Sequence, residues 1–351
     1  CSSDLQVRAA TAARQRWFTL LGTLGGKWPH TQSVEPGGST RPIDAAERVR
    51  LLAKLREFRA FLERQLIGDA LEAFTALDSE DALWAWHAQA PLGSDLRFFL
   101  TLVQDLSLQT LGPGPGRYLS FGAYAQPGGG HALAQGLWRA DAQRLDAVDA
   151  HAITEDATHA WLAQAREPLH PLHGLTRPEP DKAGAYTWNK APRLGGEVVE
   201  TGAIARQLTS GHPLVRDAVA HHGGTVFTRV LARVLELARV LPMMEDWLQA
   251  IRPTEAFCVP TELPDEGHGV GLSEAARGAL GHWLVVRGGR IANYQIVAPT
   301  SWNFSPRDAQ GTPGALEQAL VDAPVREGEK TPVAVQHIVR SFDPCMVCTV
   351  H

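Results

Sequence analysis

The segment RSFDPCMVCTVH, residues 340–351, carries the most specific pattern in the chain. Cys345 and Cys348 lie three positions apart, and His351 follows three positions later. Two thiolates at this spacing can bind one soft metal ion, because the turn between them brings both sulfur atoms to the same side. The pattern leaves three kinds of site open: a structural zinc site, a catalytic transition-metal site and a redox CxxC pair.

These alternatives differ in what else the chain must supply. A structural zinc site needs two further ligands, which Cys258 and one of the 14 histidines could provide. A redox pair needs a following helix whose N-terminus lowers the pKa of the first thiol. Only three residues follow Cys348, so the redox pair is the least favoured of the three. Four cysteines in 351 residues are also too few for a disulfide scaffold.

The composition bounds the class of protein. With 351 residues, 44% of them hydrophobic, the chain can form one large domain or about two of average size. Its net charge of -5 excludes a generally basic nucleic-acid-binding protein. No segment approaches the ~20 apolar residues that a membrane span needs. The first residues lack the pattern of a signal peptide, so we expect a cytoplasmic protein.

Outward from the C-terminal segment, hydrophobic periodicity predicts a mainly helical chain with small antiparallel sheets. Alternating apolar residues around Gly288 and Gly289 predict a hairpin of strands 283–286 and 291–297. The other predicted elements are helices over 4–25, 43–67, 79–88, 95–110, 212–250 and 313–322, loops with one or two short strands over 112–135, irregular structure over 165–200 and a short approach to the terminus over 333–341.

Six segments resemble, in the same order, sequence blocks of nickel–iron hydrogenase large subunits. They are GGKWPH (25–30), YTWNKAPR (186–193), SEAARGALGHW (273–283), RIANYQIVAPTSWNFSPRD (290–308), GTPGALEQAL (311–320) and DPCMVCTVH (343–351). The resemblance covers essentially the whole chain. Among the subgroups, it is most similar to the cytoplasmic dihydrogen-sensing (regulatory) and related uptake hydrogenases.

The resemblance implies a fold that is mainly α with small antiparallel β elements (α+β), in the manner of the helical bundle of these large subunits. It implies one domain over 1–351, made of a helical part (1–110), an irregular and β insert (111–211) and a part with the long helix, the hairpin and the metal-ligand segment (212–351). The family's other two metal-binding cysteines lie in an RxCGxC motif that has no match here. We therefore expect that the N-terminal part is missing and that this chain alone is inactive.

The resemblance also implies the metal ligands. In that family four cysteines hold a nickel–iron centre whose iron carries cyanide and carbon monoxide, and soft thiolates suit both metals. Cys345 matches a terminal nickel ligand, and Cys348 matches the ligand that bridges nickel and iron. His351 and the backbone carbonyl of Ile296 match ligands of a buried magnesium or similar ion.

Further residues match positions around the centre. Arg277 matches the arginine above the open metal position, where a guanidinium can polarise a substrate. Asp343 could pair with it, and Pro299 and Thr300 match residues that pack on and hydrogen-bond the cyanide ligands. Without the resemblance, Arg277 would be a surface or salt-bridge residue and Asp343 a turn-forming Asp-Pro. The family has proline before this arginine, where this chain has Ala276.

Glu274 and His282 lie in the same segment as Arg277 and also match family positions. We interpret them as parts of a buried polar network that supports the arginine.

The function that the resemblance implies is that of an enzyme. It would be the large, catalytic subunit of a nickel–iron hydrogenase, which splits dihydrogen heterolytically and passes electrons to an iron–sulfur small subunit. A second form of the same hypothesis is a dihydrogen sensor that signals to a histidine kinase. The alternative of a different class is a zinc-stabilised, non-catalytic structural or interaction protein.

Overall fold

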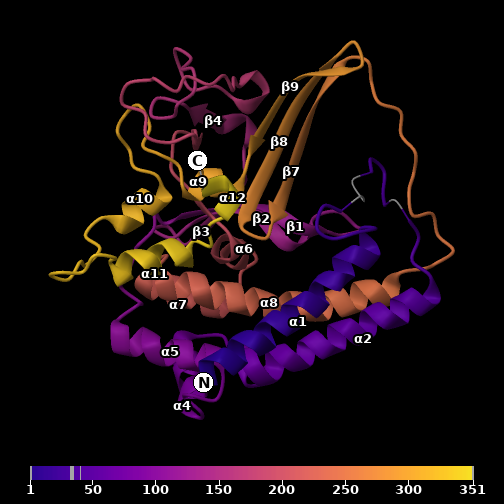
Figure 1. The fold of residues 1–351 in the computed structure, drawn as a ribbon, viewed down its shortest axis with the longest axis vertical. Helices are drawn as coiled ribbons and strands as arrows, with labels where there is room; N and C mark the ends of the chain where they lie inside the picture. The colour runs from indigo at the N-terminus through magenta and orange to yellow at the C-terminus, as the bar shows by residue number, and fades with distance from the viewer. Residues whose placement is uncertain (1, 32–34, 40, 350–351) are drawn as a thin grey trace. The chain divides into compact units, whose positions relative to one another are not determined.

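The computed structural model describes residues 2–31, 35–39 and 41–349. Within them the chain is mainly helical with small antiparallel sheets, so the predicted fold class is confirmed (Figure 1). The α-helices are α1 (Ser2–Leu24), α2 (Ala45–Phe61), α3 (Leu71–Thr75), α4 (Glu80–Ala88), α5 (Asp95–Leu106), α6 (Ala203–Thr209), α7 (Pro213–His222), α8 (Val226–Ala250), α9 (Pro299–Asn303), α10 (Ala315–Leu320), α11 (Val333–Ser341) and α12 (Met346–Thr349).

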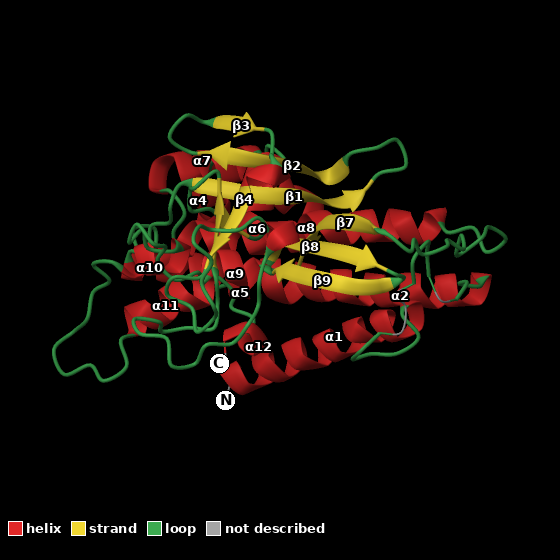
Figure 2. Cartoon of the chain, turned by 90° about the horizontal axis from the view of Figure 1, so that it is seen from above, coloured by secondary structure: helices red, strands yellow, loops and turns green. Residues whose placement is uncertain are grey.

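Among the described residues three sheets accompany the helices, and Figure 2 shows β7 of one of the two larger sheets beside β1 of the other. The first has the strand order β3-β2-β1-β6, with β6 parallel to β1; the second pairs β4 with β5; the third has the order β7-β8-β9. The strands are β1 (Arg117–Ala125), β2 (His131–Arg139), β3 (Arg144–Asp146), β4 (Ile153–Asp156), β5 (Ala191–Leu194), β6 (Glu200–Thr201), β7 (Gly267–Ala275), β8 (Gly278–Arg287) and β9 (Arg290–Val297).

The chain divides into two compact units. The first comprises Cys1–Ala76, Gln89–Leu100 and Leu235–Leu263, and the second comprises Leu77–Ala88, Thr101–Val234 and Pro264–His351. All the predicted site residues belong to the second unit.

The first unit is built on α1 and α2. Asp44 begins α2, because its side chain accepts a hydrogen bond from the Glu47 N–H at 2.6 Å while the Glu47 carboxylate accepts one from the Asp44 N–H at 3.1 Å. The rings of Trp17 and Phe58 stack between the two helices with their centroids 4.2 Å apart. A π-helical segment, Leu62–Ile67, continues α2 and ends at a glycine.

The core of the second unit lies between β1 and the sheet β7-β8-β9. Phe121 of β1, Trp283 of β8, Val297 of β9 and Trp302 of α9 are almost completely buried in one cluster. Every residue of α6 is buried as well. The turn between β7 and β8 and the helix α9 both adjoin this core, and both contribute to the site.

The structure refines several predicted elements. The predicted hairpin is confirmed, with both Gly288 and Gly289 at positive φ in its turn, but its strands are longer and β7 adds a third. The helix predicted over 212–250 is two helices, because α7 ends at Gly223, whose φ is 70°. Residues 333–341 form the helix α11, and α6 and α9 were not predicted.

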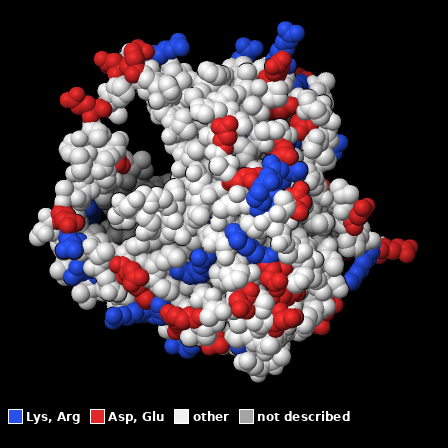
Figure 3. Space-filling view, turned by 180° about the vertical axis from the view of Figure 1, so that it is seen from behind, with Lys and Arg blue, Asp and Glu red and all other residues white. Residues whose placement is uncertain are grey.

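No helix among the described residues is long and apolar enough to cross a membrane. On the face shown in Figure 3, Lys and Arg side chains lie among Asp and Glu side chains.

Candidate metal centre

The centre of the candidate site is the thiol pair, which we define as Cys345 and Cys348. The Cys348 N–H donates to the Cys345 carbonyl oxygen at 3.0 Å, and α12 begins at the residue after Cys345. This single turn brings the two half-buried thiols into hydrogen-bond contact with each other. Because α12 packs on α9, the pair lies beside the buried Thr300.

The surroundings of the thiol pair raise the pKa of the Cys348 thiol above its usual value. Burial raises the pKa of the Cys348 thiol, and so does its hydrogen bond with Cys345. A hydrogen bond with Thr300 and the positive charge of Arg277 lower the same pKa, but by less. Two adjacent desolvated thiols are an arrangement in which a metal cation can replace the protons, because a thiolate pair favours a soft cation.

Arg277 lies beside the segment that leads into the thiol pair, as the sequence predicts. Its Nε donates to the backbone carbonyl oxygen of Asp343 at 3.0 Å and lies 3.6 Å from the Asp343 carboxylate. Asp343 has a positive φ of 54°, which turns the chain just before Pro344. The structure therefore brings together the predicted Arg277, Asp343 and thiol pair.

Arg277 occupies a tight turn between β7 and β8, which we call the Arg277 turn (residues 275–278). Gly278 has a φ of 132° and packs so closely on β6 that a Cβ there would lie 2.6 Å from the Gly202 nitrogen and would collide with Thr201. Asn303 of α9 fixes Thr201 in turn, accepting from its N–H at 2.9 Å and donating to its carbonyl oxygen at 3.0 Å. The backbone of the turn is thus placed against β6.

Arginines of α8 hold the segment before the thiol pair, and sequence reasoning missed their role. Arg229 forms a buried ion pair with Glu200 at 2.7 Å, donates to the Gly112 carbonyl oxygen at 2.8 Å and to the Ser341 hydroxyl at 3.3 Å, and stacks over the Phe342 ring. The signal was present in the sequence, since α8 is an apolar helix interrupted by arginines. Such interruptions mark buried arginines that have specific partners.

The next arginine of α8, Arg233, extends this contact. Its Nη2 donates to the Ser341 carbonyl oxygen at 2.7 Å, and its Nε lies 3.8 Å from the Asp343 carboxylate. Asp343 therefore lies between the guanidinium groups of Arg233 and Arg277.

The predicted residues of α9 and β9 differ in their surroundings. Pro299 is the first residue of α9, and it is buried, as is Thr300 next to Cys348. The side chain of Ile296 is 48% exposed on β9, so any role at a metal would be through its backbone carbonyl. His351 lies outside the described residues, and the predicted magnesium site stays a prediction.

Glu274 and His282 have different surroundings. Glu274 is buried and forms an ion pair with Arg206 of α6, with the Arg206 Nη1 2.8 Å from a carboxylate oxygen. His282 is outside this contact: its Nδ1 lies 2.6 Å from the hydroxyl of Tyr294 on the solvent-facing side of the sheet. The polar support of the arginine segment therefore comes from Glu274 and Arg206.

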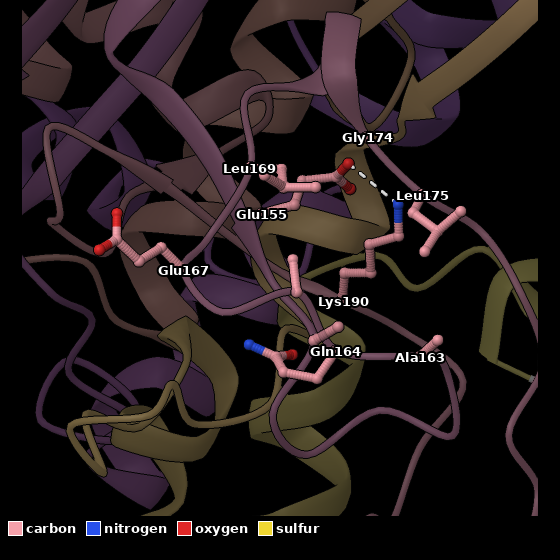
Figure 4. A pocket seen from close by; sticks show the side chains of 10 residues that line it. Glu155, Ala163, Gln164, Glu167, Leu169, Gly174, Leu175 and Lys190 are labelled. Atoms are coloured by element: carbon pink, nitrogen blue, oxygen red, sulfur yellow. Dashed lines mark hydrogen bonds and ion pairs between the residues drawn. The ribbon is translucent and has the colours of Figure 1, made fainter.

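A pocket elsewhere in the same unit is lined by an ion pair and by no cysteine (Figure 4). The Lys190 ammonium lies 3.2 Å from the Glu155 carboxylate and donates to the Gln295 side chain at 2.9 Å. Burial raises the pKa of Glu155, and the Lys190 charge lowers it by less. Because the lysine and the carboxylate neutralise each other at its wall, we interpret this pocket as structural.

The residues of the site fit a nickel–iron centre in part. The thiol pair supplies two of the four thiolates that such a centre needs, with a guanidinium beside it and a hydroxyl against one sulfur. A zinc site would need Cys258 and a histidine beside the pair. Among residues 2–31, 35–39 and 41–349, no group of three or more His, Cys, Asp and Glu side chains is placed to share a metal.

Comparison with known proteins agrees with the site. Residues 9–351 match the family described as nickel-dependent hydrogenase. The periplasmic [NiFeSe] hydrogenase large subunit of Desulfomicrobium baculatum is 29% identical, over 99% of this chain and 65% of its own length. The uptake hydrogenase large subunit of Cupriavidus necator is 32% identical, over 96% of this chain and 63% of its own length. The chain thus spans less than two thirds of these curated relatives.

Solved structures show the same fold. The reduced Ni-Fe-Se hydrogenase of Desulfovibrio vulgaris Hildenborough superposes with a TM-score of 0.81 at 28% identity, over 99% of this chain and 70% of that one. The H2-activated [NiFeSe]-hydrogenase of Dm. baculatum gives 0.82 at 28% identity, over 99% and 69%. The predicted type of helical bundle is confirmed. On its sequence and its fold, this chain belongs to the nickel-dependent hydrogenase family.

Proposed function

We propose that this chain forms part of the large, catalytic subunit of a nickel–iron hydrogenase, which oxidises dihydrogen to two protons and two electrons. The observation that carries the proposal is the contact of Arg277 with Asp343 immediately before the thiol pair. Family membership supports the proposal, and the two relatives described above, both named hydrogenase large subunits, match almost the whole chain.

Each residue of the site has a role in this proposal. Cys345 and Cys348 would hold the nickel–iron centre through their thiolates, and Pro299 and Thr300 would pack on and hydrogen-bond the cyanide ligands of its iron. When bound, the centre supplies the soft metal at which dihydrogen is polarised and electrons are accepted.

The remaining residues act on the surroundings of the centre. Arg277 presents a fixed positive charge beside the thiol pair, oriented by the Asp343 carbonyl. The buried Thr300 keeps its hydroxyl on the Cys348 sulfur and excludes water from that side. The magnesium ion at His351 and the Ile296 carbonyl belongs to the proposal as a structural ion.

Electrons must leave the site through another chain. The four cysteines of this sequence are too few to hold iron–sulfur clusters beside the metal centre. We therefore propose an iron–sulfur small subunit as the partner. The cytoplasmic location stays a prediction.

A sensing role is the narrower form of the proposal. It rests on the likeness of GGKWPH, APTSWN (298–303) and the C-terminal segment to the regulatory subgroup. A sensor would turn over dihydrogen slowly and bind a histidine kinase. The relatives above are named [NiFeSe] and uptake hydrogenases, so the catalytic role is the one we favour.

The proposal is tested on the protein purified from its native host with the subunits that accompany it. We expect about one nickel per chain, iron in excess, and dihydrogen-dependent reduction of an artificial acceptor such as a viologen. Zinc in place of nickel, or nickel without dihydrogen oxidation, would overturn the catalytic assignment. A low turnover together with a co-purified kinase would favour the sensor.

A further inference from the structure

One buried side chain of α6 holds the backbone of the Arg277 turn. The Nη1 of Arg206 donates to the Ala275 carbonyl oxygen at 3.0 Å, and its Nη2 donates to the Ala276 carbonyl oxygen at 2.9 Å. These are the two residues immediately before Arg277. The same guanidinium donates to the Glu274 carboxylate at 2.8 Å.

This contact joins three parts of the unit. The second oxygen of the Glu274 carboxylate accepts a hydrogen bond from the Phe121 N–H of β1 at 2.7 Å. The side chains of Arg206 and Glu274 are only 3% and 1% exposed, and all of α6 is buried. Because α6 and β1 belong to the core, the position of the Arg277 turn is set by the core and not by solvent-exposed contacts.

The chemistry of this position calls for arginine. A guanidinium donates from several nitrogens in one plane, so it can bind a carboxylate and two carbonyl oxygens at once. A lysine ammonium keeps the charge but is a single flexible point, and it cannot reproduce that planar set of contacts. The carbonyl oxygens of Ala275 and Ala276 are both bound by this one side chain, in contacts that are partly buried.

We propose that Arg206 is a positioning residue for Arg277. By fixing the carbonyl groups of Ala275 and Ala276, it sets the direction in which the turn presents the Arg277 guanidinium to the thiol pair. The consequence for dihydrogen oxidation rests on the proposed function, whereas the effect on the turn does not.

The test uses Arg206→Lys in the protein purified with its subunits. Lysine keeps a positive charge opposite Glu274, so the buried carboxylate is not left alone. We expect nickel content within about a tenth of that of the parent protein. We expect kcat for dihydrogen oxidation to fall about 10- to 100-fold, as for a displaced reacting group, with KM for dihydrogen within about twofold.

Arg193→Lys is the matched control. Arg193 is also buried, forms an ion pair with Asp308 at 2.9 Å and donates to the Thr312 and Pro306 carbonyl oxygens at 3.0 and 3.3 Å. It holds a loop that carries none of the predicted site residues. We expect a similar loss of thermal stability from this variant but a kcat within about twofold of the parent.

Hydrogen–deuterium exchange of the peptide covering 270–282 gives a readout that does not depend on turnover. Arg206→Lys should speed exchange at 275–278, with and without nickel, whereas Arg193→Lys should not. Combining Arg206→Lys with Arg277→Lys should reduce kcat by much less than the product of the two single effects, because both substitutions act through the same group, the Arg277 side chain. Unchanged exchange at the turn, or fully multiplicative losses, would overturn the proposal.

The two proposals fail in different ways. If the parent protein binds no nickel and oxidises no dihydrogen, while exchange at 275–278 still rises in Arg206→Lys, the proposed function fails and the positioning of the turn stands. If Arg206→Lys does not fold, Glu274→Gln takes its place, since glutamine can still accept from Phe121. A Glu274→Gln protein with unchanged kcat and unchanged exchange would overturn the role of this contact.

Discussion

The Nε of Arg277 lies 3.0 Å from the backbone carbonyl oxygen of Asp343 but 3.6 Å from the nearer carboxylate oxygen of the same residue. The main chain therefore provides the shorter contact, and the carboxylate, which also lies 3.8 Å from Arg233, provides a looser one. The guanidinium is oriented by the segment that carries the thiol pair itself.

This geometry separates the effects of two substitutions. Arg277→Lys keeps a positive charge but removes the Nε donor and the planar guanidinium, and it should lower kcat for dihydrogen oxidation by about 100-fold or more, as loss of a preorganised donor does elsewhere. Asp343→Asn keeps the backbone carbonyl and should lower it by less than about 10-fold. Nickel content and thermal unfolding should match the parent in both. Equal losses would show that the carboxylate, and not the carbonyl, orients the arginine.

The thiol pair should be needed for nickel. We expect Cys345→Ser and Cys348→Ser each to reduce nickel to less than about a tenth of an atom per chain, because an alcohol is a poor ligand for a soft metal. Cys258→Ser is the control, since Cys258 belongs to the first unit, where its backbone forms an isolated β-bridge with Gly38. Elemental analysis decides: a loss of bound metal in Cys258→Ser would favour the zinc-site alternative.

The close packing of the Arg277 turn predicts a strong effect of one methyl group. Gly278→Ala places a Cβ against Thr201 and the Gly202 nitrogen at a positive φ, so it should lower the free energy of unfolding by roughly 2–4 kcal/mol. Gly271→Ala on β7 should cost less than about 1 kcal/mol, because no atom lies within 4 Å of its Cβ position. Chemical denaturation measures both. Similar losses in the two variants would contradict the packing described for β6.

The buried ion pair of Arg193 and Asp308 predicts a pH dependence. Burial raises the pKa of Asp308, but hydrogen bonds from Thr312 and Arg193 outweigh it, so the pKa lies below the usual 3.8. A lowered carboxyl pKa contributes stability that is present above the unfolded-state value and is lost as the pH falls through the folded-state value.

Asp308→Asn should therefore cost about 3–5 kcal/mol at neutral pH, because it leaves a buried arginine without its counter-charge. The difference between parent and variant should shrink as the pH falls below about 3.8. Denaturation curves at several pH values check this, with the exposed Asp141→Asn as control. A difference that stays constant with pH would show that the carboxylate is not ionised in the folded protein.

The sequence predicted the helices with an apolar stripe and the glycine turn of the hairpin, because periodicity and turn chemistry are local. It did not predict α6, since the seven residues of this short helix, polar and apolar alike, are all buried, so its sequence lacks the division into an apolar and a polar face that reveals a helical period. Residues 212–250 read as one helix because Gly223 and Gly224 were weaker signals than the apolar run around them.

The candidate site was likewise predicted only in part. The thiol pair and Arg277 were predicted from motifs that resemble a family, and the structure brings them together. The contacts that Arg206 and Arg229 make around them, with Glu274, Glu200 and Gly112, could not be predicted, because each joins residues separated by between 29 and 117 positions along the chain. Such pairings depend on the tertiary fold, and no local pattern encodes them.

Arg229 shows how far along the chain the contacts that place the thiol pair extend. Arg229 contacts Ser341 and Phe342 of the segment before the cysteines, in addition to the contacts of Arg233 with Ser341 and of Arg277 with Asp343. Replacement of the one guanidinium of Arg229 would remove two of the contacts that place the segment before the thiols, although Arg229 lies 112 positions before Ser341 in the chain.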